Sequence, residues 1–236
     1  MLEEIARTPF ADRVEAGRQL GARLVALNLA HPVVLALPRG GVPVGLEVAR
    51  ALNAPLDLLL VRKIGVPWQP ELAVAAVMDG AEPVLVVERH VQAEAGVKEE
   101  YINERAKLEL AEIEHRRRSY LADRAPVAVA GRTAIVVDDG IATGTTMRAA
   151  LKGLRRRNPA RLVLAVPVAP PDTIDELRKE VDDVVCLAQP SFFGAIGYFY
   201  RDFHQLSDDE VIAMMRQAPA AESTVVHCKA RARRRC

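Results

Sequence analysis

Apolar and polar residues follow two alternating patterns along most of the chain. Residues 10–29 carry apolar side chains at helical spacing among charged ones, which predicts an amphipathic helix. Helices are also predicted at 42–52, from the loop near 144 to about Arg157, around 171–180 and from about Asp208 to Arg216. The short apolar runs between them are typical of strands buried on both faces of a sheet, and they are Val33 to Leu37, Leu56 to Val61, Ala134 to Val137, Arg161 to Val168 and Val184 to Leu187.

This alternation predicts an α/β fold with a doubly wound, mostly parallel sheet. Two more apolar runs, Leu72 to Met78 and Val84 to Val87, are predicted to be strands. Residues 91–120 are highly charged, with a thin apolar stripe and several glutamates four residues before Arg or Lys, which predicts one long, half-exposed helix. We therefore expect a helical insertion at about 89–122.

Three consecutive arginines in this segment, Arg116, Arg117 and Arg118, raise the alternative of a nucleic-acid contact. The same face carries many glutamates, so a solvated helix is the preferred interpretation. The whole chain has 32 Lys and Arg against 31 Asp and Glu, a net charge of +1. No global field therefore favours nucleic acid or an anionic membrane.

Length and composition fit one globular domain with appendages. The chain has 236 residues, half of them hydrophobic, which is enough for a sizeable core. No apolar run approaches the roughly 20 residues that span a bilayer, and the start, MLEEIARTPF, is too acidic and interrupted for a secretory signal. We expect a cytoplasmic protein with no membrane partner. The cysteines are too far apart for a zinc site or a disulfide framework and are interpreted as reduced thiols; they are Cys186, Cys228 and Cys236.

A loop rich in glycine and threonine follows the predicted strand at 134–137. In open α/β sheets, ligands bind at the carboxyl ends of strands, where backbone N–H groups and a helix N-terminus favour an anion. Two glycines let the backbone approach a phosphate, and three threonines add hydroxyl donors. The sequence thus predicts a phosphate-binding loop made of Gly140, Ile141, Ala142, Thr143, Gly144, Thr145 and Thr146.

Two adjacent carboxylates, Asp138 and Asp139, stand between the strand and this loop. Neighbouring desolvated carboxylates repel each other unless hydroxyl donors or a cation stabilise them. The pair therefore indicates a polyol ligand with a hydrated Mg²⁺ close by. A structural role as helix caps would explain one aspartate, but neither the second nor the threonine-rich run.

The whole element, IVVDDGIATGTT, resembles the signature that binds 5-phosphoribosyl-1-pyrophosphate (PRPP) in type I phosphoribosyltransferases. The resemblance implies that Asp138 and Asp139 contact the ribose 2′- and 3′-hydroxyls and, through water, Mg²⁺, while residues 140–146 hold the 5′-phosphate. Where guanine and hypoxanthine enzymes of the family carry an aspartate, this loop has Ala142, as adenine-type members do. A general base on the loop is therefore not expected.

The turn after the first predicted strand is Pro38-Arg39-Gly40-Gly41. Its glycines allow successive N–H groups to face an anion, and an arginine offers a planar fork to phosphate oxygens. The turn resembles the pyrophosphate loop of the same family, which implies pyrophosphate contacts from Arg39, Gly40 and Gly41. An ordinary strand-to-helix turn is the alternative.

Residues 62–71, RKIGVPWQPE, contain a glycine and two prolines, which argue against regular structure. The segment resembles the flexible catalytic loop of the family. The resemblance implies that Arg62 and Lys63 meet pyrophosphate oxygens in the transition state. Glu71 is a candidate acid or base for the acceptor.

An aromatic cluster at about 189–205 matches the position of the hood with which type I enzymes choose their acceptor. Phe192, Phe193 and Tyr198 are candidates to stack on a planar base, and a satellite hydrophobic cluster at the sheet edge is the alternative. We expect one phosphoribosyltransferase-like domain at 1–218 and a disordered, basic tail at 219–236.

Three classes of function follow from these features. The first is a transferase that moves phosphoribosyl from PRPP, with Mg²⁺, to a nitrogenous base and releases pyrophosphate; family members are often homodimers, but the resemblance is to members of unassigned acceptor. The second is a regulator that senses PRPP or a nucleotide without turnover, although no DNA-reading helix-turn-helix is evident. The third, a nicotinamide-dependent dehydrogenase, is disfavoured because residues 38–45 lack G-x-G-x-x-G.

Overall fold

A five-stranded, fully parallel sheet forms the centre of the computed structural model, which describes residues 10–80, 83–122 and 124–219. The strand order is β2-β1-β6-β7-β8. All five predicted strands are present, and their bounds are β1 Pro32–Ala36, β2 Leu56–Leu58, β6 Thr133–Val137, β7 Arg161–Val168 and β8 Asp183–Ala188. The second is shorter than predicted, because it ends at Leu58 and not at Val61, and β8 is partly rather than fully buried. The reversal of strand order beside β1 and β6 opens a crevice at their carboxyl ends, where this class of sheet binds ligands.

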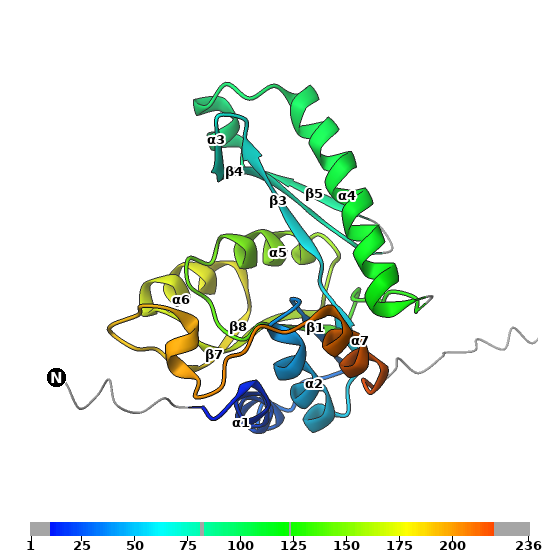
Figure 1. Cartoon of the computed structure of the whole chain (residues 1–236), viewed down its shortest axis with the longest axis vertical. Coiled ribbons are helices and arrows are strands. Elements are labelled where there is room, and N and C mark those ends of the chain that lie inside the picture. Colours follow the sequence, from blue (N-terminus) through cyan, green and yellow to red (C-terminus); the bar gives the residue numbers. More distant parts are fainter. Residues whose placement is uncertain (1–9, 81–82, 123, 220–236) are drawn as a thin grey trace, which may run out of the picture.

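Helices cover both faces of this sheet, as expected for a doubly wound fold (Figure 1). One face packs on α1 (Arg13–Val25), α2 (Gly41–Leu52) and α7 (Asp208–Arg216), and the other on α5 (Thr145–Arg155) and α6 (Pro171–Leu177). Alternate residues of each strand serve the two cores, because side chains alternate across a strand. In β6, Ile135 and Val137 join the first core, whereas Ala134 and Val136 join the second.

A second, antiparallel sheet rises from the central domain (Figure 1). It has the order β3-β4-β5, with β3 Val61–Val66, β4 Gln69–Met78 and β5 Val84–Val87. The expectation that residues 62–71 lack regular structure is wrong: they form the tip of the β3-β4 hairpin. Ile64, Val66 and Val74 are buried under the helical insertion. This apolar burial outweighs the tendency of Gly65 and the prolines to interrupt a strand. Their effect is limited to shifts in the strand register around Gly65.

The charged insertion consists of two helices rather than one. α3 (Arg89–Glu94) ends before Gly96, whose φ of +59° suits glycine, and α4 (Glu99–Leu121) then runs back toward the central domain. Short 3₁₀ turns at Arg178–Glu180 and Ile196–Phe199 complete the described elements. In the described ranges, no helix is both long and apolar enough to cross a bilayer.

The cysteines take no part in a described disulfide. Cys186 is a half-buried free thiol on β8, and burial raises its pKa to about 11. Cys228 and Cys236, with the basic tail beyond Pro219, lie outside the described residues. The Pro219 carbonyl accepts hydrogen bonds from Leu56 N at 3.3 Å and from Arg124 Nη2 at 3.1 Å.

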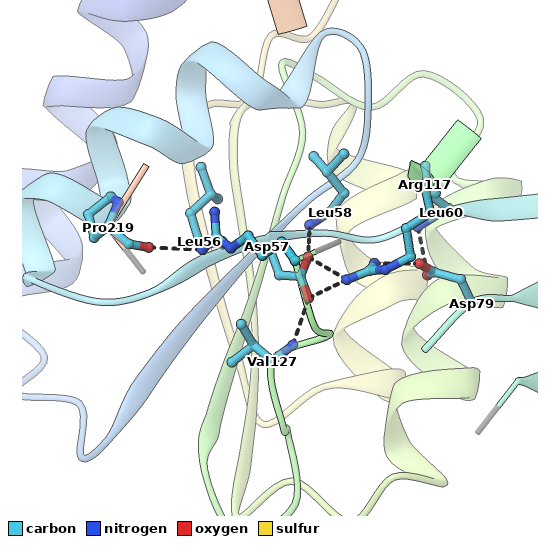
Figure 2. Close-up of polar contacts among 9 residues, drawn as sticks. Leu56, Asp57, Leu58, Leu60, Asp79, Arg117, Val127 and Pro219 are labelled. Atoms are coloured by element: carbon cyan, nitrogen blue, oxygen red, sulfur yellow. Dashed lines mark hydrogen bonds and ion pairs between the residues drawn. The ribbon is translucent and has the colours of Figure 1, made fainter. Parts of the chain in front are cut away.

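A buried ion network joins α4 to both sheets (Figure 2). Arg117 donates through Nη2 to both carboxylate oxygens of Asp57 at 2.9 and 3.0 Å, and through Nη1 to Asp79 at 2.7 Å. Asp57 also accepts from Leu58 N and Val127 N, each at 2.8 Å. The second arginine of the charged trio is therefore a structural residue, not a nucleic-acid contact.

Opposing effects set the ionisation of this network. Burial raises the pKa of Asp79, and the nearby Arg117 only partly offsets it. Burial lowers the pKa of Arg117, but the charges and hydrogen bonds of the two acids outweigh it, so that this pKa is raised. Asp79 thus depends on the guanidinium for its ionised form.

Arg117→Leu should lower the free energy of unfolding by about 3–5 kcal/mol at pH 7, because it removes the cation that is hydrogen-bonded to two buried carboxylates. Without Arg117 the folded-state pKa of Asp79, which burial already raises, rises further, so the stability of the variant is retained below about pH 4 and lost as pH rises. Urea unfolding at a series of pH values measures both effects. Arg118→Leu, at an exposed position of the same helix, serves as the control; an equal loss there would contradict the assignment.

Candidate functional site

The turn after β1 and the loop after β6 lie side by side at the edge of the central sheet. Leu37 N donates to Val137 O at 2.9 Å, which continues the strand pairing into the two connections. A Cβ atom added to Gly40 would lie 2.1 Å from Asp139 Oδ2, and one added to Gly41 would lie 2.8 Å from Val137 O. Only glycine permits this approach of the two backbones.

The predicted phosphate loop is open to solvent on one side and anchored on the other. Ala142, Thr143, Thr145 and Thr146 are exposed. Ile141 N donates to Val168 O at 2.9 Å, and Thr173 Oγ1 donates to Ala142 O at 3.0 Å, which holds the loop against β7 and α6.

Gly144 is the N-cap of α5, with a φ of +71° and no side-chain cap. The first N–H groups of an α-helix lack intrahelical partners, and the helix dipole favours negative charge there. The N-terminus of α5 is therefore suited to a phosphate, with Thr145 and Thr146 supplying hydroxyl groups beside it.

The paired aspartates follow β6 directly. Burial, then the charge of Asp139, raises the pKa of Asp138 well above its ordinary value. Burial also raises the pKa of Asp139, against the hydrogen bond and charge of Arg13. Asp139 N donates to Asp138 Oδ1 at 2.9 Å. Local cations thus offset the burial of the two carboxylates only in part. Hydroxyl donors or a further cation would therefore stabilise their ionised forms.

These carboxylates fit Mg²⁺ only as part of a shared coordination shell. The described residues contain no cluster of three or more His, Cys, Asp or Glu side chains that could hold a metal alone. Mg²⁺ commonly keeps several waters and binds through one or two carboxylates together with substrate phosphates. Asp138 and Asp139 match that donor set.

Arg13 of α1 is the main site residue that the sequence did not suggest. Its Nε donates to Asp139 Oδ2 at 2.8 Å, and both side chains are about nine-tenths buried. Nη1 donates to His204 O at 3.0 Å, and the guanidinium carbon lies 3.8 Å above the Phe203 ring. No local motif marks this arginine, because its partners lie 126 and 191 positions away along the chain.

The aromatic segment also reaches the aspartates, through residues other than the predicted ones. Tyr200 OH donates to Asp139 O at 2.5 Å, and its ring stacks on Phe203 with centroids 5.0 Å apart. Of the predicted stacking residues, Phe192 and Tyr198 are exposed, whereas Phe193 stacks on Phe199 at 5.3 Å. The aromatic cluster therefore supports the site from Tyr200 and Phe203.

The predicted cations of the hairpin are each paired with an acid. Arg62 Nε donates to Glu109 Oε2 at 3.0 Å, and Lys63 Nζ donates to Glu71 Oε2 at 2.8 Å. The hydrogen bond from Lys63 lowers the pKa of Glu71. Lys63 and Glu71 line a cavity that Thr145 and Thr146 also line, so the structure brings the hairpin and the phosphate loop together.

Arg39 lies at the other side of the site. Its Nη1 donates to Leu206 O at 2.8 Å, and its Nε is 3.8 Å from Asp208 Oδ1. Arg39 and Gly40 line a hollow together with Arg13, Asp139 and residues 203–206. The turn, Asp139 and residues 203–206 thus line the same hollow.

Known proteins resemble this chain over most of its length. Residues 13–204 match the family model described as "Phosphoribosyl transferase domain". Relatives in two strains of Mycobacterium tuberculosis, each named "Putative phosphoribosyl transferase", are 45% identical over 209 residues, which are 89% of this chain and 47% of theirs. The chain spans about half the length of these curated relatives.

A crystal structure of the protein TT1426 from Thermus thermophilus has 40% sequence identity and a TM-score of 0.80, over 90% of this chain and 99% of that chain. The fold of the central domain is thus shared with an experimentally determined structure. Together with the family match over most of the sequence, these likenesses show that the chain belongs to the phosphoribosyl transferase family and has the type I fold.

Proposed function

We propose that the protein binds PRPP with Mg²⁺ and transfers its phosphoribosyl group to a nitrogenous base, with release of pyrophosphate. The family membership supports a transferase of this class. The chemistry of the site residues supports PRPP and Mg²⁺ as its ligands.

One observation carries the proposal: the paired aspartates, the phosphate loop, the turn and the hairpin are linked by direct contacts or a shared cavity. The loop with the uncapped N-terminus of α5 follows the aspartates, the Gly40 turn lies against Asp139, and the β3-β4 hairpin shares a cavity with Thr145 and Thr146. PRPP has a phosphate at one end, a diphosphate at the other and a diol between them. These elements offer a binding group for each of the three parts of PRPP.

The residues of the chain would act by holding charge and position. Asp138 and Asp139 accept hydrogen bonds from the ribose hydroxyls and stabilise the positive charge that develops on the ring as the C1′–oxygen bond breaks. Arg39, Arg62 and Lys63 neutralise the departing pyrophosphate. Glu71 is the candidate acid or base for the acceptor. Its hydrogen bond from Lys63 lowers its pKa, so it becomes a stronger base once Lys63 turns from it to the pyrophosphate. Bound Mg²⁺ would supply further positive charge to the pyrophosphate, held by its oxygens, water and the aspartates.

We further propose that the protein acts in the cytoplasm and as a homodimer. The free thiol of Cys186 is consistent with the first proposal, because the cytoplasm keeps thiols reduced. The exposed, charged face of α4 supports the second, because it offers a surface for pairing.

Isothermal calorimetry with PRPP and Mg²⁺ should show one binding event per chain, lost when Mg²⁺ is removed with EDTA. A pyrophosphate-release screen over purines, pyrimidines and other nitrogen acceptors should then find base-dependent release. PRPP binding without release for any acceptor would favour the sensing regulator instead. Absence of PRPP binding would refute the transferase and a PRPP sensor alike.

Asp138→Asn should stabilise the ligand-free chain at pH 7 and weaken PRPP binding by roughly tenfold or more, because it removes a charged hydrogen-bond acceptor. The raised pKa of Asp138 means that the ionised form costs folding free energy, so the gain should appear as pH rises above about 4 and vanish below it. Thermal melting across pH and calorimetry measure the two effects.

Asp175→Asn, at an exposed position of α6, is the control and should change neither quantity. An Asp138→Asn variant that binds and turns over PRPP like the wild type would contradict the role of this carboxylate. A variant that loses stability at pH 7 would contradict the electrostatic account of its burial.

A further inference from the structure

Arg116, on the insertion helix α4, lies on the wall of the proposed active site. It lines a hollow together with Pro38 of the turn, Arg62 of the hairpin and Thr146 at the start of α5. The turn and the hairpin are assigned above to the pyrophosphate, and the start of α5 to the phosphate. α4 is therefore a fourth element that lines this hollow.

A second contact places Arg116 near Arg39. Tyr120 OH, one turn further along α4, donates to Asp208 Oδ1 at 2.6 Å, and Arg39 Nε lies 3.8 Å from the same oxygen. Burial, with the hydrogen bond and charge of Asp208, raises the pKa of Tyr120 to about 12, while the charges of Arg116 and Arg39 act on it in the opposite direction. Both arginines thus lie close to the Tyr120–Asp208 contact.

Three guanidinium groups from separate elements converge here, and each is only partly engaged. Arg62 contacts Glu109 through Nε at 3.0 Å, and Arg116 contacts Glu112 through Nε at 2.9 Å. In the contacts given for the described residues, the Nη groups of both arginines are therefore available to donate to a ligand. The Arg116–Glu112 pair is four residues apart on one helix and exposed, with 46% and 41% of the side chains accessible. Exposed pairs of this kind are weak and are easily exchanged for a phosphate.

The charged trio of α4 does not act as one basic stripe. Arg117 is buried between Asp57 and Asp79, and Arg118 pairs with Glu114 at 2.7 Å with 70% of its side chain exposed. Arg116 alone of the three lines the hollow beside the turn and the hairpin. The geometry favours a small diphosphate ligand over an extended nucleic-acid backbone.

We propose that Arg116 is a further pyrophosphate-binding residue, which joins Arg39 and Arg62 in holding the diphosphate of PRPP. The inference rests on the proposed function and extends it to the helical insertion. On binding, Arg116 exchanges its contact with Glu112 for diphosphate oxygens. The insertion thereby contributes directly to substrate binding.

The test compares Arg116→Ala with Arg118→Ala by calorimetry in the presence of Mg²⁺. Arg118 is a matched control, since it has the same i,i+4 pairing on the same helix but lies outside the hollow. Two probes are used: PRPP, and ribose 5-phosphate, which lacks the diphosphate. Arg116→Ala should bind PRPP roughly tenfold more weakly than the wild type, with unchanged affinity for ribose 5-phosphate, and Arg118→Ala should match the wild type for both.

Wild-type affinity of Arg116→Ala for PRPP would overturn the inference and leave the proposed function intact. Equal losses for both probes, or for both variants, would also overturn it, because they indicate a general effect on folding or on surface charge. A wild-type chain that does not bind PRPP refutes the proposed function, and this inference with it.

Discussion

The close contact between the backbone at Gly40 and the carboxylate of Asp139 is the constraint on which the site depends. It brings the connections after β1 and β6 within van der Waals distance, so that the turn and the acids form one surface. A side chain at Gly40 would separate them. Asp139 is held in this position from behind by Arg13 and from its carbonyl by Tyr200.

Two substructures contribute different chemistry to this surface. The parallel sheet supplies the aspartates and the N-terminus of α5, which suit a sugar and its phosphate. The antiparallel sheet and α4 supply cations on an arm outside the central sheet. Arg117 joins α4 to β2 through its two hydrogen bonds to Asp57, and to the end of β4 through its hydrogen bond to Asp79. The affinity for a substrate that contacts both substructures therefore depends on contacts far from the substrate, such as those of Arg117.

The parallel sheet and its loop were predictable because each depends on local sequence. Apolar runs of four to eight residues define the strands, and the aspartates, glycines and threonines that follow the run ending at Val137 mark the ligand-binding end. Most of β4 and all of β5 were predicted, but β3 and the tip of the hairpin were missed, because Gly65 and the prolines indicate a loop when the apolar cover from α4 is unknown. Arg13 and Tyr200 were missed as site residues for a related reason: their contacts with Asp139 join distant parts of the chain. Nothing in the described structure selects an acceptor for the exposed Phe192 and Tyr198.

The distance along the chain between Arg13 and its partners has a consequence for biosynthesis. Arg13 leaves the ribosome well before Asp139 and His204, whose carboxylate and carbonyl oxygen it contacts in the folded chain. Contacts of such long sequence separation form late, since the intervening chain must first be ordered. A nascent chain can thus complete much of its parallel sheet while its ligand-binding crevice is still unfinished, and the crevice closes only after the aromatic segment has emerged.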